Sequence, residues 1–274
     1  MASGPLVSVC IPVYNGEKYI GETIESVLKQ TFKDFELVVC NNCSTDHTLD
    51  VVSKYQDPRI RVVTNEQNVG MVGNWNVCLK EARAPYVTVL CADDLITPTC
   101  LEKKYKMISK DERITLVFGA STVINTKGKV VVNRRPLRKT DVYNGAQIAK
   151  KSFRSHNIFG EPSNIMVRKD VALKLGGYTK DVLYSPDWEF CMRVASSGKV
   201  GYINEPLMQY RVSNDNLTTD FLKRNDLLEQ DEKVLIREVK HISGLRLTQG
   251  DVVAHKVSIK ARLIERYWFM KLLR

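Results

Sequence analysis

The sequence predicts an α/β protein with a Rossmann-like, mostly parallel central sheet, helices on its faces and a helical extension at the C-terminus. Short apolar runs of strand length alternate with segments in which apolar residues recur at helical spacing. Polar residues follow directly after several of the apolar runs. Because strands alternate with helices, we expect a parallel sheet wound through right-handed crossovers.

Four strands are predicted in the first hundred residues. Residues 6–13 form a continuous apolar run, which is typical of a strand buried on both faces. Comparable runs follow at residues 35–40, 60–64 and 86–91. These runs are of strand length, which favours strands over buried helices.

Helices are predicted between these strands by the spacing of apolar side chains. The positions that define them are Ile20, Ile24, Val27 and Leu28 in the first helix, and Val72, Trp75 and Leu79 in the third. The helix between these two has Ser44 as its expected N-cap, with Asp46 in its first turn.

Polar side chains follow three of the predicted strands. They are Pro12, Tyr14 and Asn15 after the first strand, Asn41 and Asn42 after the second, and Asp93 and Asp94 after the fourth. Ligands of open parallel sheets bind at the carboxyl ends of the strands, so we expect a ligand site here. The chain lacks the dinucleotide-binding and P-loop glycine motifs, which leaves the class of ligand open at this point.

Cys40 and Cys43 have the spacing of a redox pair or of half a zinc site. A structural zinc site needs four ligands, and no second pair has matching spacing. A redox pair would place Cys40 at the start of a helix, whereas Cys40 ends a predicted strand. We therefore interpret both residues as small apolar fillers. An odd total of seven cysteines favours reduced thiols in a cytoplasmic protein.

The net charge of +10 indicates an anionic partner, such as nucleotide phosphate, a phospholipid surface or nucleic acid. Nucleic acid is not expected, because the chain carries no recognised nucleic-acid-binding motif. No apolar run is long enough to span a membrane, and the N-terminus does not look like a secretory signal. We expect a cytoplasmic protein, with peripheral contact at the inner face of the membrane as an option.

Seven stretches in this order resemble one family. They are "VSVCIPVYNGEKYIGETIESVLKQTF", "VVCNNCSTDHT", "NVGMVGNWN", "YVTVLCADDLITP", "GEPSNIMVRKD", "YSPDWEFCMRVASSG" and "EPLMQYR". Together they are similar to the family 2 inverting glycosyltransferases with the GT-A fold, and to a bacterial-type subgroup that builds surface polysaccharides. The resemblance covers about residues 6–218. It implies a nucleotide-diphospho-sugar donor, a saccharide or lipid-linked acceptor and a divalent metal, Mn²⁺ or Mg²⁺.

The resemblance also implies roles for individual residues. Those expected at the nucleotide-sugar are Pro12, Tyr14, Asn15, Asn41, Asn42, Asn68, Asn76, Ala92, Asp93 and Arg211. Among these, Asn41 would read the base, and Arg211 would clamp a phosphate. Asp93 and Asp94 would hold the metal, and Asp187 would be the catalytic base.

Reaction chemistry supports these carboxylate assignments. Charge builds up on the diphosphate leaving group, and a divalent cation held by carboxylates lowers that barrier. An acceptor hydroxyl must lose its proton as it attacks, and a carboxylate such as Asp187 can accept that proton. One base and direct attack predict inversion at the anomeric carbon. The alternative for each residue is structural: Asp93-Asp94 as a solvated turn, and Asp187 as a helix cap.

Two positions depart from the family pattern. Cys91 stands where the family often has the first aspartate of its metal motif, and Ser213 where many members have a histidine. The metal would then rest on Asp93 and phosphate, with Asp94 in support. Because Asn41 and Asn42 are both amides, uridine, thymidine and guanosine nucleotides all remain open.

We divide the chain into a nucleotide-sugar-binding half (1–105), an acceptor-binding half with the base (106–218) and a helical extension (219–274). The basic residues Arg134, Arg135, Arg138 and Lys139 are expected in a loop that is solvated or that contacts an acceptor pyrophosphate or anionic lipid. Residues 153–160 are expected to form a mobile flap. The segment "RLIERYWFMKLLR" favours packing against protein, including a partner subunit, over an interfacial anchor.

Two other functions compete with an inverting glycosyltransferase. A nucleotidyltransferase would share this kind of sheet, but usually opens with a glycine-rich loop carrying Arg and Lys, where this chain has "PVYNGEKY". A non-catalytic nucleotide-sugar-binding protein is the other alternative, because of Cys91 and Ser213.

Overall fold

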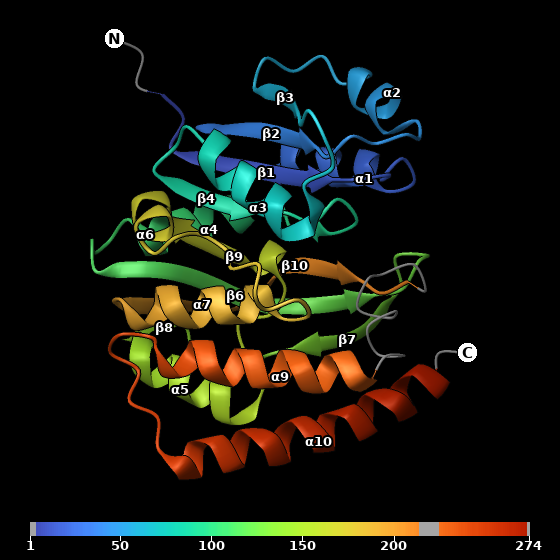
Figure 1. Ribbon diagram of the computed structural model, residues 1–274. Helices are drawn as coiled ribbons and strands as arrows, with labels where there is room; N and C mark the ends of the chain where they lie inside the picture. Colours follow the sequence, from blue (N-terminus) through green and yellow to red (C-terminus); the bar gives the residue numbers. More distant parts are fainter. Residues whose placement is uncertain (1–3, 214–224, 273–274) are drawn as a thin grey trace.

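One sheet of ten strands forms the centre of the protein (Figure 1). The structure is a computed structural model that describes residues 4–213 and 225–272, with side chains described for residues 4–213 and 228–261. The strand order is β3-β2-β1-β4-β9-β6-β10-β5, with β7 paired to β6 and β8 paired to β10. The predicted α/β class is therefore confirmed.

Six strands of the sheet run in one direction. They are β1 (Val7–Val13), β2 (Phe35–Asn41), β3 (Ile60–Thr64), β4 (Tyr86–Val89), β6 (Ile114–Ile124) and β10 (Lys199–Arg211). The other four strands of the sheet run the opposite way. They are β5 (Leu95–Ile96), β7 (Val130–Arg134), β8 (Asp141–Asn144) and β9 (Ile165–Arg168). The first four strands lie within two residues of their predicted bounds.

Helices cover both faces of the sheet, and each face has its own apolar core. One face packs against α1 (Ile20–Leu28), α2 (Thr48–Ser53) and α4 (Cys100–Ile108). The other packs against α3 (Gly70–Glu81), α5 (Gly145–Ser155), α6 (Lys169–Lys174) and α7 (Pro186–Ser196). Because side chains alternate along a strand, Val7, Val9 and Ile11 reach the first core and Cys10 the second.

The C-terminal extension consists of α9 (Asn225–Lys240) and α10 (Gln249–Leu272). Both helices lie beyond α7 and α5, on the side of the sheet away from β3 (Figure 1). Leu235, Val239 and Val252 join the core that α5 and α7 line, so this part of the extension packs against the rest of the chain. The side chains of residues 262–274, which include the aromatic cluster of the last helix, lie outside the described residues.

The expected division at residues 105 and 106 falls inside α4. Strands from both halves share one sheet, in which β9 of the second half pairs with β4 of the first. We keep the division only as a proposal about which half binds which substrate.

The predicted cap of α2 is wrong. The helix begins at Thr48, and Asp46 rather than Ser44 accepts its first N–H, with 3.0 Å between Thr48 N and Asp46 Oδ1. Ser44 lies too far upstream to reach that turn and instead accepts a hydrogen bond from Asn15 N at 3.0 Å. It therefore joins the loop after β2 to the loop after β1.

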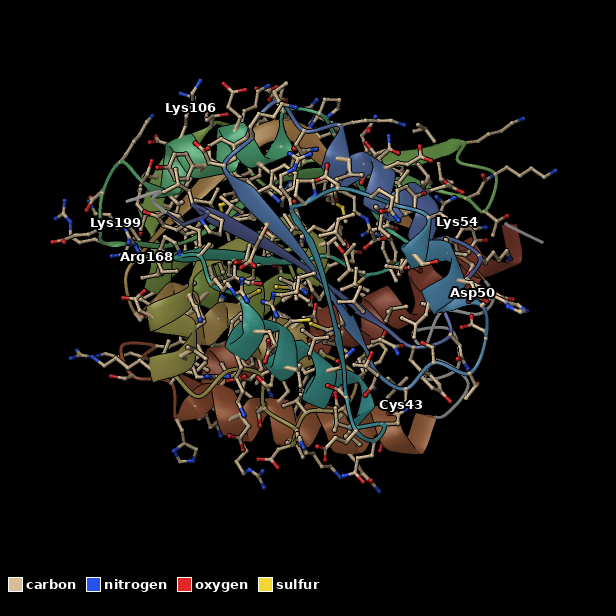
Figure 2. All side chains as sticks on the ribbon, turned by 90° about the horizontal axis from the view of Figure 1, so that it is seen from above. Cys43, Asp50, Lys54, Lys106, Arg168 and Lys199 are labelled. Carbon is tan, nitrogen blue, oxygen red and sulfur yellow. The ribbon has the colours of Figure 1, made fainter. Side chains whose placement is uncertain are left out.

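Cys40 and Cys43 form no disulfide, and all seven cysteines are free thiols. Cys40 is fully buried in β2, whereas Cys43 is half-buried and its thiol donates to Asn65 O. Figure 2 shows Cys43 at the side toward which β1 and β2 point, away from Arg168 and Lys199. The arrangement agrees with the interpretation of both residues as fillers.

Residues 153–160 are not an exposed flap. Phe153, Ile158 and Phe159 are buried in the core beneath α5 and α7. Their apolar side chains anchor the segment, which is why the expectation of a mobile flap is wrong.

The basic cluster lies partly in a strand and partly in the loop after it. Arg134 ends β7, while Arg135, Arg138 and Lys139 follow it as exposed residues.

Candidate active site

The loops after β1 and β2 hold each other through side chains that cap backbone groups. Asn15 Oδ1 accepts a hydrogen bond from Thr45 N at 2.8 Å, and Asp46 Oδ2 accepts one from Glu17 N at 3.0 Å. Asn15 has a φ of 52°, a left-handed conformation that asparagine tolerates better than most residues. Tyr14 is 52% exposed beside these contacts. Pro12, Tyr14 and Asn15 thus lie at the carboxyl edge of the sheet, as the sequence predicted.

Asn41 and Asn42 serve the framework of this edge. Both side chains are almost completely buried. Asn41 Oδ1 accepts from Ser44 N at 3.0 Å, while Asn42 donates to Asn68 Oδ1 at 2.8 Å and accepts from Val69 N at 3.0 Å. Since these amides bind the protein's own groups, the structure brings Asn41, Asn42 and Asn68 together as a network that shapes the loops.

The side chain of Asn76 binds the backbone of Tyr178, and its expected place at the nucleotide-sugar stays a prediction. Its amide donates to Tyr178 O and accepts from Tyr178 N, both at 2.8 Å. This pair of bonds ties α3 to the chain that leads into α7. The approach is close enough that a Cβ on Gly177 would lie 2.3 Å from Asn76 Oδ1.

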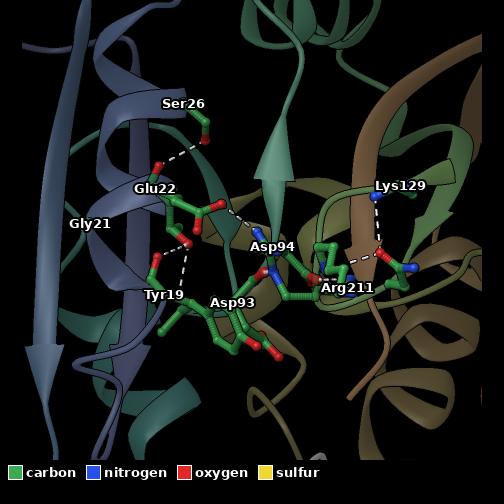
Figure 3. Close-up of polar contacts among 12 residues, drawn as sticks. Tyr19, Gly21, Glu22, Ser26, Asp93, Asp94, Lys129 and Arg211 are labelled. Carbon is green, nitrogen blue, oxygen red and sulfur yellow. Dashed lines mark hydrogen bonds and ion pairs between the residues drawn. The ribbon is translucent and has the colours of Figure 1, made fainter.

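Asp94 is turned into the protein (Figure 3). It is 1% exposed, and its carboxylate accepts from Arg211 N at 3.0 Å and from Ser163 Oγ at 2.5 Å. Ser163 Oγ also accepts from Cys91 N at 3.0 Å. Asp94 therefore joins β10 and the turn at Pro162–Asn164 to the end of β4. Both of its oxygens accept hydrogen bonds from the protein, and its expected role as a metal ligand stays a prediction.

Arg211 is also turned inward, and its expected role as a phosphate clamp stays a prediction. Its guanidinium donates to Asp93 O at 3.0 Å and to Glu22 Oε2 at 2.7 Å, and lies 4.5 Å from the centre of the Tyr19 ring. The residue is 1% exposed, so it holds the Asp93-Asp94 turn against α1 (Figure 3). Glu22 and Tyr19 gave no signal in the sequence, because their partner lies far away along the chain.

Asp93 is left facing outward from the same turn, half-buried. Burial raises the pKa of its carboxyl, and its own backbone N–H and the charge of Arg211 lower it in part. No side chain of residues 4–213 and 228–261 donates a hydrogen bond to this carboxylate. The neighbouring Ala92 is also half-buried, and its carbonyl accepts from Thr23 Oγ1 at 2.8 Å.

Asp187 is the second residue of α7, directly after Pro186. Burial and, to a smaller extent, the charge of Glu161 raise the pKa of this carboxyl to about 7. The N–H groups at the start of α7 and the amide of Asn157 act in the opposite direction. Asn157 Nδ2 lies 3.1 Å from Asp187 Oδ2. The balance gives a carboxylate that can take up a proton near neutral pH.

Residues 157–164 connect Asp187 with the Asp93-Asp94 turn. Asn157 contacts Asp187, and Ser163 contacts Asp94. Between them, Glu161 lies close enough to both aspartates to raise the pKa of each. One Glu161 oxygen accepts from Arg134 at 2.6 Å, while Oε2 is buried without a hydrogen-bond partner among the described residues. The sequence analysis missed Glu161 and Asn157, although "GEPSN" contains the first.

Cys91 and Ser213 mark the positions that depart from the family pattern. Burial raises the pKa of the Cys91 thiol well above its usual range, and the charges of Asp94 and Asp93 raise it further. The thiol therefore stays protonated at neutral pH, and does not supply the charge that an aspartate would. Ser213 is 7% exposed at the end of the described part of this half.

Comparison with known proteins identifies the family. A family model described as glycosyl transferase family 2 matches residues 8–176, which is more than half of the chain. The chain belongs to the family 2 glycosyltransferases. An uncharacterized glycosyltransferase of Methanocaldococcus jannaschii is 33% identical to it over 228 residues, which cover 81% of this chain and 76% of that protein.

A second relative matches less than half of this glycosyltransferase. It is the UDP-Glc:alpha-D-GlcNAc-diphosphoundecaprenol beta-1,3-glucosyltransferase WfgD of Escherichia coli. The two are 38% identical over 125 residues, which are 46% of this chain and 49% of that protein.

Solved structures agree with the fold of this glycosyltransferase. Residues 1–349 of S. aureus TarS in complex with UDP-GlcNAc superpose with a TM-score of 0.70, at 20% identity, over 92% of this chain and 71% of that chain. A mannosyltransferase from Pyrobaculum calidifontis in complex with GDP-Man and Mn²⁺ gives 0.62 at 19% identity, over 99% of this chain and 81% of that chain. The expected GT-A fold is therefore confirmed.

In this glycosyltransferase, the surroundings of the Asp93 carboxylate are suited to a divalent metal. Asp93 faces outward and pays a desolvation cost that a cation would offset, whereas Asp94 is committed to protein partners. The described parts of the chain contain no group of three or more His, Cys, Asp or Glu side chains that could hold a metal ion. A site with one carboxylate suits Mg²⁺ or Mn²⁺, which often complete their shell with substrate phosphates.

Proposed function

We propose that this glycosyltransferase moves a sugar from a nucleotide-diphospho-sugar to a hydroxyl of a saccharide or lipid-linked acceptor, with inversion at the anomeric carbon. The observation that carries the proposal is the environment of Asp187. This half-buried carboxylate, with a pKa raised to about 7, is connected to the Asp93-Asp94 turn through residues 157–164. A base of this strength is suited to removing a proton from a hydroxyl at neutral pH.

The donor would bind at the carboxyl edge of β1, β2 and β4. Tyr14 offers an exposed ring there, and the asparagine network holds the surrounding loops in shape. Uridine, thymidine and guanosine remain the candidate bases. The relatives support this range, since one is named for UDP-Glc, and the two solved structures hold UDP-GlcNAc and GDP-Man.

Asp93 would hold the divalent metal, Mn²⁺ or Mg²⁺, with Asp94 and Arg211 fixing the turn that presents it. When bound, such a metal supplies positive charge beside the diphosphate leaving group. The Mn²⁺ in the mannosyltransferase complex supports this assignment.

In the transfer step, the acceptor oxygen forms a bond to the anomeric carbon while the bond from that carbon to the diphosphate oxygen breaks. Asp187 takes the hydroxyl proton, and Asn157 holds the oxygen Oδ2 of this carboxylate in place. Glu161 Oε2 would accept a hydrogen bond from a sugar hydroxyl, since it is a buried oxygen fixed in orientation by the bond from Arg134 to Oε1.

The acceptor side would be formed by the second half of the chain. The exposed Arg138 and Lys139 lie in the loop after β7, whose Arg134 contacts Glu161. Their charge suits a lipid diphosphate or an anionic membrane surface. Among the described residues, no helix is both long and apolar enough to cross a membrane. We propose polysaccharide or glycolipid assembly as the process served.

Asp187→Asn tests the proposal. The substitution keeps the shape of the side chain and removes its ability to take a proton. We expect nucleotide affinity to be preserved and the transfer rate to fall about 10²–10⁴-fold. Transfer is measured with a panel of uridine, thymidine and guanosine diphospho-sugars, and binding by calorimetry with the matching diphosphates. A transfer rate near that of the wild type would refute the role of Asp187, and Glu189 would be examined next.

A further inference from the structure

Asp231 of α9 contacts the short loop that leads into α7. Its carboxylate is 6% exposed and accepts a hydrogen bond from Leu183 N at 2.5 Å. Ser185 Oγ lies 3.4 Å from its other oxygen. Burial raises the pKa of Asp231, while the backbone N–H groups of residues 183–185 counter that rise by donating to the carboxylate. The Asp231 carboxylate, from the C-terminal extension, therefore interacts with the backbone N–H groups of the three successive residues 183–185.

This loop determines where α7 begins, and Asp187 is the second residue of that helix. Ser185 is the N-cap of α7, and its carbonyl accepts from Trp188 N at 3.1 Å and from Glu189 N at 3.2 Å. Its hydroxyl makes no capping bond to the helix. The position of the first turn of α7 therefore depends on how residues 183–185 are held, and Asp231 is a buried side chain that binds them.

A second contact from the extension reaches Trp188, the residue after Asp187. His255 of α10 is 1% exposed, stacks on Phe153 with ring centres 4.3 Å apart, and lies 2.7 Å from Phe153 O through Nδ1. Its ring centre lies 5.6 Å from that of Trp188, the neighbour of Asp187 in the chain.

A chain of hydrogen bonds connects Trp188 with the segment that contains Asn157. Ser152 Oγ accepts from Trp188 Nε1 at 2.8 Å and from Ile158 N at 3.2 Å. Asn157, next to Ile158, donates to Asp187. Helices α9 and α10 thus support Asp187 both through the loop before it and through its hydrogen-bond donor.

We propose that α9 and α10 form a brace that positions Asp187, with Asp231 as the main positioning residue. The inference rests on the proposed role of Asp187 as the base. The matched family segment ends at residue 176, so the base and its brace both belong to the part of the chain beyond it. A base must be held within hydrogen-bond reach of the proton it removes, and small displacements cost much of the rate.

The test is a double-mutant cycle between Asp231→Ala and Asp187→Asn. We expect Asp231→Ala to lower kcat about 10–100-fold while KM for the donor stays unchanged, because a misplacement of about 1 Å can cost 10²-fold. In the Asp187→Asn background the same change should have little further effect, since the group that it positions is already inactive. Glu229→Gln, at an exposed residue of the same helix, is the matched control and should leave kcat unchanged. Equal losses in both backgrounds, or a rise in donor KM, would overturn the proposal.

Hydrogen exchange tests the brace without relying on activity. In Asp231→Ala, and to a smaller extent in Asp231→Asn, amides of residues 183–189 should exchange faster, while those of β1 and β2 stay protected. Unchanged exchange at 183–189 would refute the brace, as would a uniform increase over the whole chain in both variants. If the wild type transferred sugar from no nucleotide-sugar in the panel, the proposed function would fail while this measurement still decided the contact between Asp231 and the loop.

Discussion

Asn157 donates a hydrogen bond to Asp187, with 3.1 Å between Nδ2 and Oδ2. The contact ties the segment that contains Glu161 and Ser163 to the start of α7. Burial and the charge of Glu161 raise the pKa of Asp187, and the Asn157 amide opposes them. The strength of the proposed base therefore depends on residues 26 and 30 positions upstream, on a different segment.

The transfer rate should depend on pH through Asp187. A base must be deprotonated to act, so we expect kcat to rise with pH through about 7 and to level off above it. The rate is measured from pH 5 to 9 under saturating donor and acceptor. A profile that is flat across this range would argue against a base with a raised pKa.

The stability of the protein should respond to the same group with the opposite sign. Asp187 has a folded-state pKa of about 7, above its usual 3.8, so it favours folding when protonated. That contribution is present below about pH 4 and is lost as the pH rises through about 7. Asp187→Asn should therefore raise Tm relative to the wild type at pH 8, and by less at pH 5. Scanning calorimetry at both values checks this difference.

Glu161→Gln should lower the pKa of Asp187, because it removes a negative charge that raises this pKa. The pH profile of kcat should then shift toward lower pH. Asn157→Ala is the matched change, since it removes a hydrogen bond to the charged form and should shift the profile upward. Shifts of the same sign in the two variants would contradict the arrangement described.

Asp93 and Asp94 should behave differently when each is changed to asparagine. Asp93→Asn should abolish the dependence of nucleotide affinity on Mn²⁺, because it neutralises the carboxylate that faces outward. Asp94→Asn should mainly destabilise the fold, by about 1–3 kcal/mol, since an amide cannot accept from both Ser163 and Arg211 as the carboxylate does. Calorimetric titration with and without Mn²⁺ and denaturant unfolding separate the two effects. Retained Mn²⁺ dependence in Asp93→Asn would remove Asp93 as the ligand.

Arg211→Met should act on stability before it acts on phosphate binding. The change removes the ion pair to Glu22 and the bond to Asp93 O, and we expect a loss of about 2–3 kcal/mol in the free energy of unfolding. Glu22→Gln removes the partner charge at an exposed side chain and should cost less. If Arg211→Met left stability unchanged but weakened diphosphate affinity about tenfold or more, the residue would act as the expected clamp after all.

Periodicity in the sequence was enough to predict the sheet and most of its first half. Strand β1 is almost wholly apolar, because a strand buried on both faces needs apolar side chains at consecutive positions. Strand β3 has the predicted bounds although it is only partly buried. The motif order likewise pointed to Asp93 and Asp187 before their surroundings were known. These features depend on neighbours in the chain, which the sequence displays directly.

The partners of the polar side chains depended on the tertiary structure. Arg211 pairs with Glu22 across 189 positions, and Asp94 accepts a hydrogen bond from Ser163 across 69, so each side chain has partners that its motif did not indicate. Asp231 likewise contacts Leu183 from another helix, 48 positions away. A sequence motif states which groups a loop carries, but the direction in which a buried charge points is set by the donors that folding brings near it. For this protein the sequence alone determined the fold class, the family resemblance and the carboxylates to consider, and tertiary packing decided which of them face the site.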